Sequence, residues 1–323
     1  MDGSRLLTAL AIGYQVGDLV GAGMVAGVRE RGFRPTGIFG PLAGAAACAW
    51  LRGLRGDQFA SALALAANMS AGLSETWRAG TDEWRYQTAL AARSAYTAAD
   101  LASQGVRGSV ETFEAPRGFQ YAYADSDQDL WSDRMEQRWA IEDVNLKLYP
   151  VCVFNQAAVQ QVLDLRTRVH GEIREIRIRM NPADSSYPGV DVVNPPSTRA
   201  AALMSVQVCA AIAALRGVVE VPDLERSGEE EVRALARRVT IEHDDSVPSH
   251  GAQVSIHTAE GVWAVSRPAA LRVEDAATAP VYEALSKMGS LNSLQAELLF
   301  NLPQLLPCRD GTRRIFEVMG ARH

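Results

Sequence analysis

Residues 31–54 read RGFRPTGIFGPLAGAAACAWLRGL, and this stretch decides how the first half of the chain folds. Pro35 restricts Arg34 to an extended backbone, and Gly37 and Gly40 permit close backbone approach. The small residues that follow predict a helix beginning near Pro41, with unpaired N–H groups and a partial positive charge at its start. Arg34 beside such a helix start can hold a carboxylate in bidentate fashion; the alternative is a surface arginine on a turn.

The flanking sequence is also helical in pattern. Apolar residues recur at three- and four-residue spacings over 1–32, with Ser4 as a candidate N-cap. Further helices are predicted at 58–75 and 86–104. Residues 105–145 are irregular, and ETFEAPRGFQYAYAD (111–125) suggests a short strand and a loop.

The second half changes character. Alternating apolar and polar residues predict strands at 171–181, 238–242 and 253–257. A helix is predicted at 199–216 and another at 280–305. We therefore expect a mainly α protein with an inserted α+β domain. The helical domain would comprise 1–141 plus 274–323, and the α+β domain 142–273.

Composition narrows the function. The 323 residues are 47% hydrophobic, and the net charge is −6. No basic stripe indicates nucleic-acid binding. The four cysteines lie far apart without a CxxC pair, which argues against zinc and fits a reducing compartment. No apolar run reaches about 20 residues. We therefore expect a cytoplasmic protein with no membrane or nucleic-acid partner.

A second motif with chemical potential is GTDEWRYQTALAAR at 80–93. Asp82 and Glu83 precede a predicted helix, where negative charge is favoured. Four large side chains then fill one turn: Trp84, Arg85, Tyr86 and Gln87. This bulk is typical of a cavity wall; the alternative is helix capping next to an ordinary buried tryptophan.

The third motif is KLYPVCVFNQAAVQ at 147–160. Lys147 is one of only two lysines, the other being Lys287. A buried Lys147 can bind an anion or act as a base. Cys152 would be a nucleophile only with a lowered pKa, and otherwise is a small core residue. None of the five histidines falls in the three motifs.

These motifs, in this order, resemble the MmgE/PrpD family, which includes 2-methylcitrate dehydratase, cis-aconitate decarboxylase and iminodisuccinate epimerase. Residues 31–54 resemble RGFHPTGxxGxxAAAAAAxxLLGL, and the segment from Gly80 resembles GTxxKRLHxGxAAxxGxxAAxLAxxGxxG. The third motif resembles KPYPxCxxxHxAID. NPPSTRAAALMSVQVCAAIAAL (194–215) resembles NPxTxxEAKFSLPYxxAxAL.

The resemblance implies a large helical domain and a smaller α+β lid, with the active site between them. It implies a homodimer that needs no metal or other cofactor. The implied chemistry is acid/base elimination on small polycarboxylates, with arginine and lysine holding carboxylates. Several positions depart from the family pattern: Arg34, Gln87 and Gln156 stand where histidines are usual, and Trp84 where lysine is frequent.

Three readings remain open. The first is a divergent lyase or isomerase acting on a carboxylate-bearing small molecule. The second is an enzyme recruited as a cyclase or isomerase of a larger secondary metabolite. The third is a split or non-catalytic subunit, because the chain begins inside the family's N-terminal domain and a partner chain would supply the missing helices. The expected catalytic residues are Lys147, Tyr86 and Tyr149; the expected substrate-binding residues are Arg34, Trp84, Arg85, Gln87 and Gln156.

Overall fold

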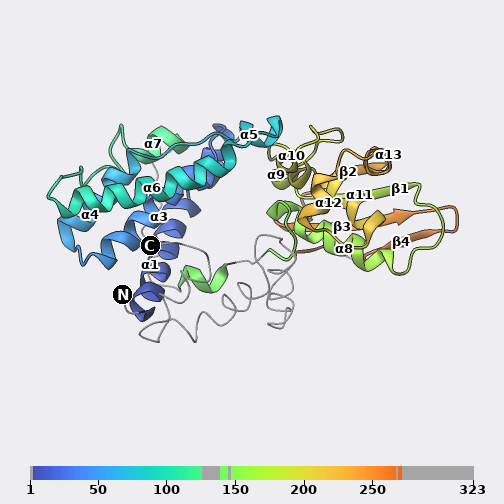
Figure 1. Ribbon diagram of the computed structural model, residues 1–323, viewed down its shortest axis with the longest axis horizontal. Helices are drawn as coiled ribbons and strands as arrows, with labels where there is room; N and C mark the ends of the chain where they lie inside the picture. The colour runs from blue at the N-terminus through green and yellow to red at the C-terminus, as the bar shows by residue number, and fades with distance from the viewer. Residues whose placement is uncertain (1–2, 126–138, 145–146, 267, 271–323) are drawn as a thin grey trace. The chain divides into compact units, whose positions relative to one another are not determined.

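The computed structural model describes residues 3–125, 139–144, 147–266 and 268–270, and these divide into two compact units (Figure 1). The first unit contains the described residues up to 74 and those from 83 to 144. The second contains 75–82 and the described residues from 147 onward. The domain limits expected from the sequence stay a prediction, and the predicted helix at 280–305 lies outside the described residues.

The first unit is helical. Its elements are α1 (Gly3–Ala22), α2 (Val25–Glu30), α3 (Pro35–Leu51), α4 (Gly56–Ala67), α6 (Glu83–Ser103), α7 (Phe119–Ala124) and the 3₁₀ turn η1 (Ala140–Asp143). Helix α3 packs against α1, α4 and α6 (Figure 1). Its Ile38 and Leu42 are fully buried in a core that also contains Met24 and several alanines. Small side chains let these helices approach closely.

Helix α3 begins at Pro35, six residues before the start predicted from the sequence. Pro35 occupies the first helical turn, where its missing N–H costs nothing, and Arg34 before it is extended, as expected (φ −86°, ψ 118°). Pro41 therefore lies inside the helix and cannot donate to Gly37 O. That carbonyl instead accepts from Ala71 N at 3.2 Å. A contact from outside the helix thus satisfies the acceptor that an interior proline leaves open.

Other predicted elements of this unit need correction. The expected helix over 1–32 is two helices that are separated at Gly23 and Met24. The expected strand within 111–125 is wrong, because that segment contains α7. The expected helix at 58–75 ends at Ala67, and the chain then crosses the start of α3. Helix α5 (Glu75–Ala79) follows and belongs to the second unit.

The second unit combines helices with a mixed sheet. After α5 its helical elements are η2 (Val153–Asn155), α8 (Gln156–Arg166), α9 (Pro182–Ser185), α10 (Arg199–Met204), α11 (Val206–Arg216), α12 (Val221–Glu225) and α13 (Glu230–Ala236). Its strands are β1 (Glu175–Met180), β2 (Val239–His243), β3 (Gly251–His257), β4 (Val262–Ala264) and β5 (Ala269–Ala270).

The sheet has the strand order β2-β1-β3-β4, with β5 also paired to β3. Strands β1 and β2 are parallel, with Ile178 opposite Ile241, whereas β1 and β3 are antiparallel, with Ile178 opposite Val254. Alternation along β1 buries Ile176, Ile178 and Met180. Helix α8 packs against β3 and α11 packs against α8 and β2 (Figure 1). The three predicted strands are confirmed, with small shifts at their ends.

The predicted helix at 199–216 is interrupted at Ser205, which is extended (φ −68°, ψ 115°). The Ser205 hydroxyl accepts from Val208 N at 3.1 Å and donates to Val192 O at 2.7 Å. Ser205 thus caps α11 and ends α10, which explains why one apolar run forms two helices. The structure agrees with the expected class, a mainly α protein with an α+β part.

Candidate functional site

Arg34 is buried at the start of α3, where it reaches the first turns of α6. Only 8% of its surface is exposed. Its Nη1 donates to the Trp84 carbonyl and, at 3.1 Å, to Gln87 Oε1. Gln87 Nε2 donates in turn to Leu73 O at 3.0 Å. The first two motifs of the sequence therefore meet in one unit, where the Trp84 carbonyl and the Gln87 amide oxygen accept from the Arg34 guanidinium.

A short segment between α4 and α5 holds this arrangement in place. Arg34 N donates to Gly72 O at 2.9 Å, and Ser74 N donates to Gly32 O at 2.9 Å. Ser70 and Ser74 add hydroxyl bonds to the carbonyls of Ile38 and Phe33, both at 2.9 Å. The start of α3 is thus held by hydrogen bonds to this segment and, through the Arg34 side chain, to α6.

We expect the Arg34→Ala variant to lose about 2 kcal/mol of unfolding free energy, because the half-buried Trp84 O and Gln87 Oε1 would lose a charged donor. Arg34→Lys should lose less, since it keeps the charge but not the planar fork. Urea unfolding followed by circular dichroism measures both. Arg93→Ala, which removes an exposed arginine from α6, is the matched control. Equal midpoints for Arg34→Ala and Arg93→Ala would contradict the structural role.

The other residues of the second motif differ in exposure. Trp84 is half-buried, and the Arg85 guanidinium carbon lies 5.1 Å from the centre of its indole ring. This stacking places a cation against an aromatic face. Tyr86 is 72% exposed on α6. The structure therefore gathers Arg34, Trp84 and Gln87, while Tyr86 projects into solvent. Their assigned roles stay predictions.

The third motif forms a loop in the second unit, anchored by Gln156 at the start of α8. Gln156 Oε1 accepts from Leu148 N at 3.0 Å and from Tyr149 N at 3.1 Å. Its Nε2 donates to Tyr149 O at 2.9 Å and to Val151 O at 3.2 Å. These bonds use the full donor and acceptor capacity of a buried amide. Substrate binding by Gln156 stays a prediction, but in this structure its amide binds the loop backbone.

Lys147 and Tyr149 are carried on this loop. Lys147 is exposed, so the burial on which its expected role depended is not found, and Tyr149 is half-buried. Burial, with a smaller effect of Asp164, raises the pKa of Tyr149 to about 12. Its hydroxyl donates to Gln160 Oε1 at 2.5 Å, and Gln160 Nε2 donates to Asp164 Oδ1 at 2.8 Å. Cys152, which follows the loop, is buried, as in the core reading of that residue.

Gln160 and Asp164 are not among the site residues predicted from the sequence. A helical signal was present, because they follow Gln156 by four and eight residues and so share one face of α8. This spacing indicates a site only when the position of the Tyr149 loop against α8 is known. Lys147, Tyr149 and Gln156 thus lie together in the second unit, and Arg34, Trp84 and Gln87 in the first. That the two groups share one cleft stays a prediction.

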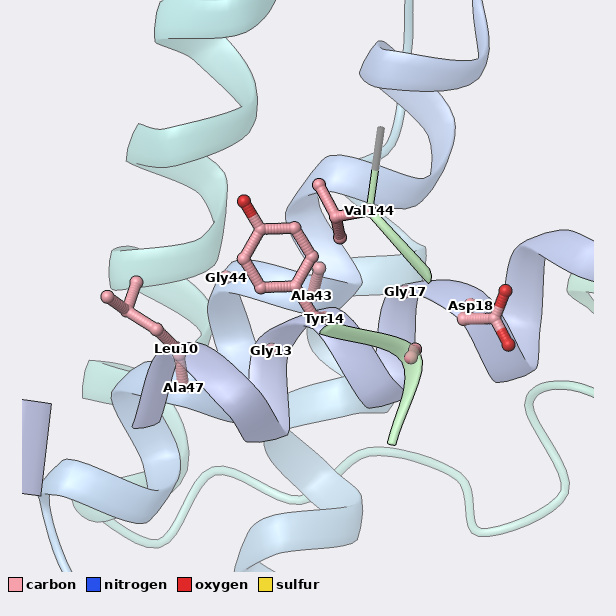
Figure 2. A pocket seen from close by; sticks show the side chains of 10 residues that line it. Leu10, Gly13, Tyr14, Gly17, Asp18, Ala43, Gly44, Ala47 and Val144 are labelled. Atoms are coloured by element: carbon pink, nitrogen blue, oxygen red, sulfur yellow. The ribbon is translucent and has the colours of Figure 1, made fainter. Parts of the chain in front are cut away.

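A separate apolar pocket of about 500 Å³ lies in the first unit between α1 and α3 (Figure 2). Tyr14 and Val144 project beside a floor of small residues that includes Gly13, Ala43 and Gly44. No predicted site residue lines this pocket. In the described part of the chain, no group of three or more histidine, cysteine or carboxylate side chains could hold a metal ion.

None of the helices in the described ranges is long and apolar enough to span a bilayer. The protein is of the two-unit class in which a helical unit is joined to an α+β unit with a mixed sheet. Residues 1–130 match the MmgE/PrpD N-terminal domain, and residues 149–267 match the MmgE/PrpD C-terminal domain. The chain belongs to the MmgE/PrpD family, which includes dehydratases and decarboxylases.

A curated relative is named after a decarboxylase. The cis-aconitate decarboxylase-like protein oryM of Aspergillus oryzae is 34% identical over 119 residues. The match covers 36% of this chain and 24% of the relative. The chain thus spans about a quarter of the length of the curated relative that it matches.

Proposed function

We propose that the protein is a lyase or isomerase that eliminates or rearranges groups on a carboxylate-bearing small molecule. Family membership and the name of the relative support lyase chemistry. In this proposal Lys147 accepts the proton next to the substrate carboxylate, and Arg34 and Arg85 bind carboxylate oxygen atoms. Tyr86 would contribute a proton to the departing group, and the Tyr149 oxygen would orient the substrate as a hydrogen-bond acceptor.

One observation carries the proposal most: the loop of Lys147 and Tyr149 is fixed by four hydrogen bonds to Gln156. A lysine on a fixed loop can meet a bound substrate in one geometry, which favours proton transfer. Gln156 stands where the family usually has histidine. We infer that it keeps the shape of the loop and leaves the proton transfer to Lys147.

A second candidate is a cyclase or isomerase of a larger, less polar metabolite. The observation that favours it is the contact of Arg34 with the first turn of α6, which carries an indole and an uncharged amide. The guanidinium donates to the Trp84 carbonyl and the Gln87 amide, and the half-buried indole of Trp84 lies on the same turn of α6. Such a surface would orient an apolar substrate as well as an anionic one.

The test uses the purified full chain with cis-aconitate, the substrate in the relative's name, and with 2-methylcitrate. Proton NMR would detect loss of either compound, and release of carbon dioxide would distinguish decarboxylation from dehydration. Turnover that Lys147→Ala removes supports the polycarboxylate lyase. Absence of turnover and of binding by calorimetry for both compounds would contradict it and favour the second candidate.

The homodimer implied by the resemblance remains a proposal. Helix α1 exposes Leu10 and Tyr14, which are 40% and 46% exposed beside the apolar pocket. We expect light scattering at micromolar concentration to give twice the chain mass of 34.9 kDa. A mass of one chain under those conditions would contradict the dimer, and a partner chain would then be sought by co-purification.

A further inference from the structure

Tyr149 is the first member of a hydrogen-bonded chain that ends on a carboxylate. Its hydroxyl lies 2.5 Å from Gln160 Oε1, and Gln160 Nε2 lies 2.8 Å from Asp164 Oδ1. Gln160 and Asp164 are one helical turn apart on α8. Gln156, one turn earlier, holds the backbone on both sides of Tyr149. One face of a single helix therefore fixes both the position of the loop and the direction of the phenol.

The direction of each hydrogen bond follows from the chemistry of the last member. An ionised carboxylate only accepts hydrogen bonds, so the Gln160 amide must turn its NH₂ group to Asp164. The amide oxygen then faces Tyr149. An oxygen atom without a hydrogen can only accept, so the phenol must be the donor. Asp164 thus decides, through Gln160, where the proton of the Tyr149 hydroxyl lies.

We propose that Gln160, oriented by Asp164, is a positioning residue that keeps Tyr149 protonated and turned toward α8. Tyr149 then offers the substrate a neutral oxygen, and the proton acceptor on this loop is Lys147. The consequence for catalysis rests on the proposed function, whereas the consequence for Tyr149 does not.

The surroundings of the phenol support this assignment. Burial, and then the charge of Asp164, raises the pKa of Tyr149 from 10.0 to about 12. Asp164 is the charged group that faces it from α8, and Lys147 precedes it by two residues on the loop. The folded chain holds this proton more tightly than the unfolded chain. The resulting stability is therefore present below pH 10 and is lost as the pH rises to about 12.

The test follows the ionisation of Tyr149 directly. All eight tyrosines are replaced by 3,5-difluorotyrosine, whose phenol ionises at lower pH, where the fold persists. Fluorine NMR resolves the side chains, and the resonance missing in Tyr149→Phe identifies Tyr149. In the parent chain, we expect Tyr149 to titrate about two pH units higher in the folded chain than in the chain unfolded in urea.

Two variants break the chain at different points. Asp164→Asn lets the Gln160 amide turn over, and Gln160→Leu removes the acceptor of the phenol proton. In each we expect this gap between the folded and the unfolded chain at Tyr149 to shrink by about one pH unit. Glu242→Gln removes one negative charge from an exposed position on β2 and should leave the gap unchanged. Circular dichroism confirms that each variant is folded.

An unchanged gap in both variants would overturn the proposal, as would an equal shrinkage in Glu242→Gln. The catalytic part has its own readout. With cis-aconitate, Gln160→Leu should lower kcat about tenfold with little change in KM, and adding it to Tyr149→Phe should cause no further loss. Absence of cis-aconitate turnover in the parent chain counts against the proposed function, while the fluorine titration still decides the role of Gln160.

Discussion

Replacing Lys147 by alanine is expected to lower turnover of cis-aconitate by about 1,000-fold or more while the chain stays folded. The size follows from the loss of a general base, which typically contributes between about 100- and 10,000-fold. Lys147 is exposed at the start of a loop whose backbone is held by hydrogen bonds to Gln156. The variant should therefore keep the parent's unfolding curve.

The matched control is Arg168→Ala. It removes an exposed cation of the same unit, beyond the far end of α8 from the loop. Steady-state kinetics on the three proteins should show loss in Lys147→Ala alone. A kcat in Lys147→Ala equal to the parent value would refute its role as the base. Loss confined to KM would instead make Lys147 a carboxylate-binding residue.

The sequence predicted the elements whose burial pattern is local. The alternation of Ile176, Ile178 and Met180 identifies β1 without reference to its neighbours, because each strand face has its own environment. The start of α3 was predicted six residues too late for the opposite reason. A proline inside a helix is tolerated only when the open carbonyl finds a donor, and the donor is Ala71, thirty-four residues after Gly37. No local pattern contains that contact.

The site follows the same division. The motifs singled out Arg34, Gln87, Lys147 and Tyr149 as candidates, because unusual side chains cluster in short segments, and their roles stay predictions. The motifs could not show that the Gln156 amide binds the loop backbone, because the sequence does not tell where a glutamine side chain points. Nor could they identify Gln160, whose role depends on the phenol of Tyr149 folding back onto α8.

The second large effect is expected in the first unit, where Gly37→Ala should cost about 3 kcal/mol of stability or more. A β-carbon at this position would lie 2.2 Å from Ala71 O and 3.0 Å from the carbonyl carbon of the same residue. Both are backbone atoms, so no side-chain rotation relieves the overlap. Alanine favours a helix by about 1 kcal/mol over glycine, and overpacking of this kind exceeds that gain.

Relief of the overlap must move the segment that crosses the start of α3. That movement would weaken the hydrogen bonds from Ala71 N to Gly37 O and from Arg34 N to Gly72 O. The hydrogen bond from Arg34 to Gln87 would be weakened with them. The control is Gly21→Ala in α1, where the added carbon would lie 3.6 Å from the Phe39 ring, an ordinary contact. This control should be neutral or stabilising by up to about 1 kcal/mol. Urea midpoints that are lowered equally in both variants would show that the close contact at Gly37 does not decide the packing of α3.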